Sequence, residues 1–213
     1  MIKNIVNHQK ASLIAISIII ILHVVGLVGI GVLHSESIVS LTWINLTVTF
    51  AIGLLFFETK FKHILVPLLL ASLIGLLTEG IGVNSGYLFG EYKYGSVLGF
   101  KIYEVPFTIG LLWAGLNVAA KNFAERITKN PWLIAIVAAS IMVLLDIVME
   151  PVAIKLEFWS WDENVIPIFN YVTWFFVSLF IQILWRNVTT KNTVFNSVFI
   201  IQAIFFIALN ILL

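Results

Sequence analysis

The chain has 213 residues, of which 61% are hydrophobic and only 11% are charged, and its formal net charge is +1. About a quarter of the residues in an average soluble domain are charged, so this composition excludes a soluble globular protein, and the small net charge argues against a nucleic-acid partner. The absence of cysteine excludes a disulfide framework and a thiolate metal site. We expect a single transmembrane domain over residues 1–213.

Seven apolar runs, each about as long as a membrane helix, follow one another along the chain. A bilayer core of about 30 Å needs roughly 20 apolar residues in a helix, and an open sheet cannot satisfy its backbone in lipid. The first run is too long for a signal-peptide core, so we expect it to be retained. The sequence predicts an all-α, polytopic membrane protein, a bundle of seven transmembrane helices over residues 11–33, 38–57, 64–83, 103–121, 131–153, 167–186 and 194–212.

Lysine and arginine are distributed unevenly between the two ends of these runs. The N-terminus and the three loops that share its side hold nine of the twelve basic residues. Because cytoplasmic loops carry the excess of basic residues, we predict a cytoplasmic N-terminus in a multi-pass protein of the cell inner (cytoplasmic) membrane. Most acids then fall in the outer half of the bundle or in its loops.

Asp146 and Glu150 stand four residues apart near the end of the fifth run, so a helix places both on one face. A charge in the hydrocarbon region costs about 2.5–3.5 kcal/mol on insertion scales, and intramembrane acids are therefore functional candidates. The alternative is a pair of helix-end acids that reach the interface, with Pro151 marking a kink.

Glu79 ends the third run and is followed at close spacing by three glycines, Gly80, Gly82 and Gly86. A glycine cap at a helix C-terminus explains the glycines. It does not explain the acid, because a carboxylate is unfavourable at the negative end of a helix dipole. We therefore expect Glu79 to point into the same outer pocket as the other two acids.

Aromatic residues are concentrated in and beside the two long loops, 84–100 and 154–166. Tryptophan and tyrosine also form belts at membrane interfaces, so each ring has this alternative explanation. In a functional role, the rings would line a pocket for a long apolar substrate, and polar side chains at the same depth would position a water. The candidates for these contacts are Asn84, Tyr94, Trp113, Trp159, Trp161, Asn170 and Trp174.

Histidines occur without ligand-like spacing, and no dinucleotide-binding glycine motif is present. We therefore predict neither a metal site nor a bound cofactor.

The pieces described above resemble the carotenoid hydratase family, which includes the bacterial γ-carotene/lycopene 1′,2′-hydratases and the archaeal bisanhydrobacterioruberin hydratase. The resemblance covers roughly residues 75–180. In one respect the chain departs from the family pattern, which usually has Asp where Glu150 precedes Pro151. The residues that carry the resemblance are Glu79-x-x-Gly82, Gly86, Phe89-Gly90-x-Tyr92-x-Tyr94, Leu98-Gly99, Val105-Pro106, Trp113, Asp146-x-x-x-Glu150-Pro151, Trp159-x-Trp161 and Pro167-x-x-Asn170-x-x-x-Trp174.

The resemblance implies a hydro-lyase, a carotenoid 1,2-hydratase of carotenoid biosynthesis. It would add water across the terminal 1′,2′ double bond of an acyclic (ψ) end group, of the lycopene or γ-carotene type, without a cofactor. Asp146 is then the leading candidate for the general acid, and Glu150 or Glu79 for the electrostatic partner and base. The substrate would come from the lipid bilayer.

Three other functions fit parts of the sequence. A carotenoid (lycopene) cyclase shares the protonation step but traps the cation with an internal double bond. A proton-coupled membrane transporter would use intramembrane acids as a relay, spread through the depth of the membrane. A non-catalytic subunit of a pigment complex would bind a carotenoid without converting it. Neither the oligomeric state nor the natural substrate follows from the sequence.

Overall fold

The computed structural model describes residues 2–213, with side chains from residue 8 onward. It is all-α apart from short strands, as predicted, and each predicted run contains a helix. The helices are α1 (Ile2–Gly31), α2 (Glu36–Val39), α3 (Thr42–Leu54), α4 (Phe61–Ser85), α5 (Phe107–Ile127), α6 (Pro131–Lys155), α7 (Ile168–Leu184) and α8 (Thr193–Leu212).

Among the described residues, five helical segments are long and apolar enough to cross a membrane, with α2 and α3 counted as one segment. The apolar helix α7 is shorter, at 17 residues, and α5 carries Lys121, Glu125 and Arg126 in its second half. The protein therefore has the helices of a membrane protein, whereas the seven-span count and the cytoplasmic N-terminus stay predictions.

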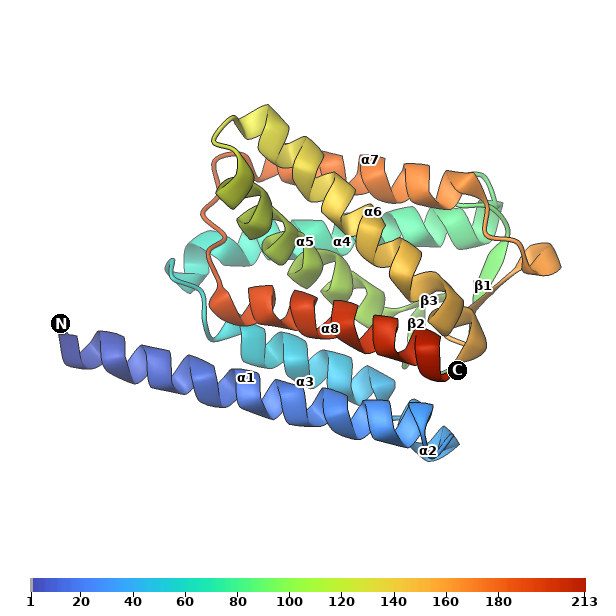
Figure 1. Ribbon diagram of the computed structural model, residues 1–213. Coiled ribbons are helices and arrows are strands. Elements are labelled where there is room, and N and C mark those ends of the chain that lie inside the picture. Colours follow the sequence, from blue (N-terminus) through green and yellow to red (C-terminus); the bar gives the residue numbers. More distant parts are fainter. Residues whose placement is uncertain (1) are drawn as a thin grey trace.

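Helix α5 lies at the centre of the bundle, between α4 and α6 on one side and α3 and α8 on the other (Figure 1). Its small residues, such as Ala114, Gly115, Ala119 and Ala120, let neighbouring helices approach closely, as is usual where membrane helices pack. Helix α1 lies on the outside, where it packs mainly on α8.

The fourth helix was predicted to begin at residue 103, and this boundary is wrong. Residues 101–106 form a tight hairpin of β2 (Lys101–Ile102) and β3 (Val105–Pro106), with Tyr103 and Glu104 in its turn at φ 49° and 65°. Apolar strands and apolar helices have similar composition, so hydropathy alone does not separate them. Pro106 then stands directly before α5, where its missing N–H costs no helical hydrogen bond.

The two segments predicted as long loops pair with each other. β1 (Tyr92–Tyr94) and β4 (Trp159–Trp161) form an antiparallel two-stranded sheet, which we call the ribbon, and the end of the bundle that carries it is the ribbon end. The short 3-10 helix η1 (Asp162–Asn164) follows β4. Just after β1, the Gly95 N–H donates to the Phe158 carbonyl at 2.9 Å. A Cβ on Gly95 would lie 1.9 Å from the Glu157 carbonyl oxygen, so only glycine permits this approach.

Helices α4 and α5 meet at Gly75, where a Cβ would lie 2.4 Å from the indole of Trp113. The indole occupies the space that a side chain at position 75 would need. Gly75 therefore sets the position of Trp113, which the next subsection places in the candidate site.

Gly75→Ala is predicted to lower the stability of the protein by about 1–3 kcal/mol, because overpacking outweighs the gain in helix propensity. Gly80→Ala on the same helix is the matched control, since the nearest atom to its new Cβ is 4.0 Å away. Thermal unfolding in detergent should show a lower apparent Tm for Gly75→Ala and an equal or higher one for Gly80→Ala. Equal values for both variants would contradict the packing argument.

Candidate functional site

The ribbon presents four aromatic side chains to the interior of the bundle. Successive side chains of a strand point to opposite faces, so Lys93 and Ser160 are exposed. The four ring-bearing residues are buried, and they stand opposite one another in two cross-strand pairs, Tyr92 with Trp161 and Tyr94 with Trp159. The hydroxyl and indole N–H groups of these rings are the donors that the buried acids of α4 and α6 need.

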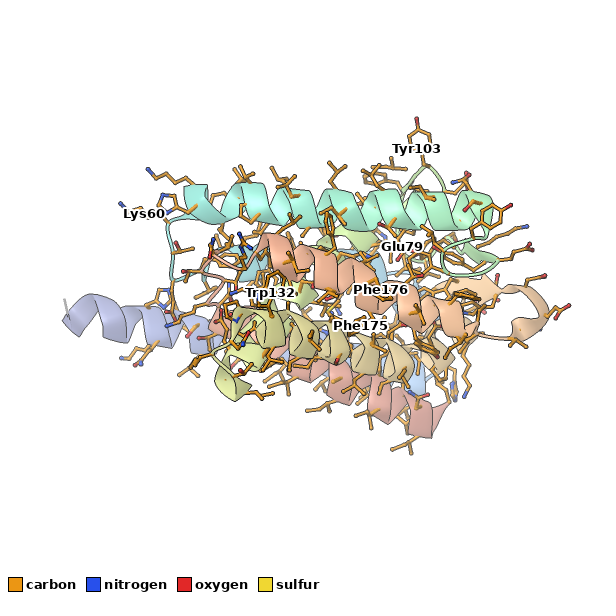
Figure 2. The ribbon with its side chains drawn as sticks, turned by 90° about the horizontal axis from the view of Figure 1, so that it is seen from above. Lys60, Glu79, Tyr103, Trp132, Phe175 and Phe176 are labelled. Carbon is orange, nitrogen blue, oxygen red and sulfur yellow. The ribbon has the colours of Figure 1, made fainter. Side chains whose placement is uncertain are left out.

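Glu79 points from α4 into the bundle, while Tyr103 projects away from it and Lys60 and Trp132 lie toward the other end (Figure 2). The Oε2 atom of Glu79 accepts hydrogen bonds from the hydroxyls of Tyr92 at 2.5 Å and Tyr94 at 2.8 Å. The indole N–H of Trp113 donates to Oε1 at 3.2 Å.

The two tyrosines of the ribbon are held in their protonated, donating form. Burial, together with the adjacent Glu79 carboxylate, raises the pKa of the Tyr92 hydroxyl and of the Tyr94 hydroxyl well above the ordinary tyrosine value. Both therefore remain hydrogen-bond donors to Glu79 throughout the neutral pH range.

Glu150, on α6, accepts hydrogen bonds from three donors. The indole N–H groups of Trp159 and Trp161 donate to its Oε2 at 3.0 and 2.9 Å. The Asn170 amide, on α7, donates to Oε1 at 3.0 Å. Each strand of the ribbon thus donates hydrogen bonds to one acid. The tyrosines of β1 donate to Glu79, and the tryptophans of β4 donate to Glu150.

Asp146 lies one turn deeper on α6 and is fully buried. The same Asn170 amide donates to its Oδ2 at 2.8 Å, so both amide hydrogens of Asn170 are used, one on each acid. The other carboxylate oxygen, Oδ1, has no hydrogen-bond partner within the described part of the chain. Asp146 therefore has the fewest donors of the three acids.

Glu79 and Glu150 face a common cavity, which we call the acid cavity. Its free volume is about 30 Å³, room for a very small number of water molecules. Trp113 and Trp174 stack against each other in its wall with ring centroids 4.5 Å apart. The lining consists of Glu79, Phe89, Tyr92, Tyr94, Ile109, Leu112, Trp113, Met149, Glu150, Trp159, Trp161, Asn170 and Trp174.

A second, more polar cavity lies at the ribbon end, and we call it the polar cleft. It has a free volume of about 410 Å³ and is lined by exposed polar residues that include Asn84, Glu91 and Asp162. Tyr92 and Trp161 line both the polar cleft and the acid cavity. One cross-strand pair of the ribbon thus lies between the acid cavity and an exposed polar surface.

Eight of the ten residues predicted for the site line the acid cavity. The exceptions are Asp146, which shares the Asn170 amide with Glu150, and Asn84, which is exposed in the polar cleft. The Asn84 amide donates to the carbonyls of Gly80 and Tyr103 at 2.7 and 3.3 Å, so it caps the end of α4 and does not reach the acids.

The site prediction omitted one polar residue of the cavity, Tyr92, although it forms the shortest hydrogen bond to Glu79. A signal for it was present in the sequence. Tyr92-x-Tyr94 and Trp159-x-Trp161 both have the two-residue period of a strand. Recognising both segments as strands would have put Tyr92 on the same face as Tyr94.

Comparison with models of known protein families gives a match. The model of the family described as "Carotenoid biosynthesis protein" matches residues 37–213, which include every residue of the acid cavity. No curated protein and no solved structure matches the chain. Because the family model covers far more than half of the sequence, the chain belongs to the carotenoid biosynthesis protein family.

Proposed function

We propose that the protein hydrates the terminal double bond of an acyclic carotenoid end group, forming a tertiary alcohol. Family membership supports a role in carotenoid biosynthesis. The observation that carries the specific reaction is the pair of acids, Glu79 and Glu150, that face one small aromatic cavity beside a polar cleft. Hydration of an alkene needs a proton donor, a negative charge that stabilises the cation, and a base for one water. The two acids supply these groups around a cavity whose free volume of about 30 Å³ suits that water.

The first step is protonation of the alkene by Glu150. Two negative charges one helical turn apart in an apolar interior are strongly unfavourable, so the Asp146–Glu150 pair holds one proton. Glu150 lines the cavity and Asp146 does not. Glu150 is therefore the catalytic acid and Asp146 a positioning residue, an order that reverses the prediction from the sequence. The proton adds to the less substituted alkene carbon, and the more substituted carbon becomes a tertiary cation.

Glu79 is the group that stabilises this cation. Glu79 is the single acid of α4, so no second carboxylate lies one turn away from it on the helix. Its two oxygens accept hydrogen bonds from Tyr92, Tyr94 and Trp113, and these donors stabilise its carboxylate form. A fixed negative charge that is shielded from bulk water acts strongly on a cation that develops beside it. The ring faces of Trp113 and Trp174 add attraction from their π electrons.

Water then attacks the cation, and Glu79 takes the proton that the water loses. The new C–O bond gives the tertiary alcohol. The cycle closes when Glu79 releases its proton and the Asp146–Glu150 pair regains one, both by exchange with water of the polar cleft. Since Tyr92 borders this cleft and also bonds Glu79, water enters beside the base that activates it.

The position of the polar cleft favours hydration over cyclisation. A cyclase must keep water away from the same cation, whereas here a single layer of side chains separates the acids from an exposed polar surface that water can reach. A transporter is also disfavoured, because the three acids gather at one end of the bundle and do not form a series through it.

Glu79→Gln and Glu150→Gln are each predicted to reduce hydration by at least about 100-fold, because each removes an acid–base step. The measurement is carotenoid mass analysis in a lycopene-producing host that lacks the step, where the product gains the mass of one water. Glu104→Gln is the control, since Glu104 is exposed in the β2–β3 turn. A product of unchanged mass with a new ring would indicate a cyclase instead.

Asp146→Asn is predicted to lower kcat by about tenfold while leaving KM nearly unchanged, because Asp146 assists Glu150 without lining the cavity. Steady-state kinetics in detergent would separate the two constants. Thermal unfolding of the same variant checks that the fold is retained. An unchanged kcat would remove Asp146 from the mechanism, and a loss as deep as that of Glu150→Gln would make it the acid itself.

A further inference from the structure

An apolar groove lies between α1, α3 and α8, on the side of the acid cavity away from α4 and α7. Its free volume is about 230 Å³. Of its four polar lining residues, three are bonded locally: His23 to the Ile19 carbonyl, Thr42 to the Val39 carbonyl and Asn45 to Thr49. Gln202 is the fourth. The groove therefore presents a mainly hydrocarbon surface.

The groove runs from an exposed mouth to a buried end. At the mouth, Val25 of α1 is 53% exposed and Val48 of α3 is 40% exposed. At the inner end, Met149 and Trp159 are 6% and 7% exposed. The mouth thus opens sideways between two apolar helices, in the direction from which a molecule dissolved in lipid would arrive.

The inner end of the groove adjoins the acid cavity. Leu112, Met149 and Trp159 line both spaces, so one layer of side chains lies between them. The Trp159 indole N–H bonds Glu150 while its ring also borders the groove. Methionine is unbranched and adaptable, so Met149 is the side chain in this layer that moves aside most easily.

The size of the groove limits what it holds. Pockets that enclose a drug-sized ligand have volumes of roughly 300–1,000 Å³, and this groove is smaller. It accommodates one part of a long apolar chain and leaves the remainder outside its mouth. A ligand of this kind is elongated, hydrocarbon and soluble in the bilayer.

We propose that this groove holds the polyene chain next to the reacting end group, which enters between α1 and α3 and reaches Glu150 past Met149. The proposal rests on the proposed function, because it assigns the occupant as the substrate of the acid cavity. Val25 of α1 and Ile44 of α3 then border the entry, and their size limits which chains pass.

Val25→Trp and Ile44→Trp test the proposal, because each places a large ring at the mouth of the groove. Val24→Trp is the matched control, since Val24 is the same residue type on the same helix, is 51% exposed and does not line the groove. Lycopene retained by the purified protein, measured by polyene absorbance after a detergent wash, reports binding without any reaction. Glu150→Gln is included because it should bind lycopene without hydrating it.

We expect Val25→Trp and Ile44→Trp to retain at least about fivefold less lycopene than the wild type, and Val24→Trp to retain a normal amount. All three variants should show similar thermal unfolding. If the wild type hydrates and Val25→Trp binds as much lycopene as Val24→Trp, the groove assignment is wrong and the proposed reaction stands. If the mouth variants lose binding but the wild type forms no alcohol, the reaction is wrong and the groove assignment stands.

Discussion

The pairing of β1 with β4 is the interaction on which the candidate site depends. Glu79 and Glu150 are buried on different helices, and an unpaired buried carboxylate costs several kcal/mol. The ribbon places two tyrosine hydroxyls on one acid and two indole N–H groups on the other. Because the strands are antiparallel and in register, the Tyr92–Trp161 and Tyr94–Trp159 pairs form a continuous aromatic wall that covers both acids. Without this pairing Glu79 would keep only its hydrogen bond from Trp113, and Glu150 only its hydrogen bond from Asn170.

The three acids differ in their surroundings, and these differences separate their proposed roles. Glu79 and Glu150 each accept three hydrogen bonds and face the cavity, whereas Asp146 accepts one and lies behind Asn170. Asn170 couples the two acids of α6, since its single amide group donates to both. The cavity also lies between two dissimilar spaces, an apolar groove and a polar cleft. A reaction that joins a hydrocarbon to water requires access to both.

Much of the site could be predicted because each of its acids is anomalous in an apolar sequence. A carboxylate inside a run of hydrophobic residues is recognisable from the sequence alone, and Asp146, Glu150 and Glu79 were identified on that basis. The depth of Asp146 suggested a role as acid, but depth along one helix does not show which side chain borders a cavity on the neighbouring helices. The surroundings of Asn84 did not follow from the sequence for a related reason. Its position at a helix end is clear in the sequence, whereas its hydrogen bonds to Gly80 and Tyr103 depend on the β2–β3 turn.

The sequence by itself determined the helical membrane-protein class, the helical runs and the three acids, because all of these follow from local hydropathy and local charge. The start of α5 and the positions of the strands did not follow from the sequence, since short apolar segments suit a strand or a helix equally well. Only the tertiary structure decided that residues 92–94 pair with residues 159–161. That contact joins segments more than 60 residues apart and depends on how α4, α5 and α6 bring their ends together. The alternating Tyr-x-Tyr and Trp-x-Trp patterns were visible in the chain, but their partners became visible only in the folded protein.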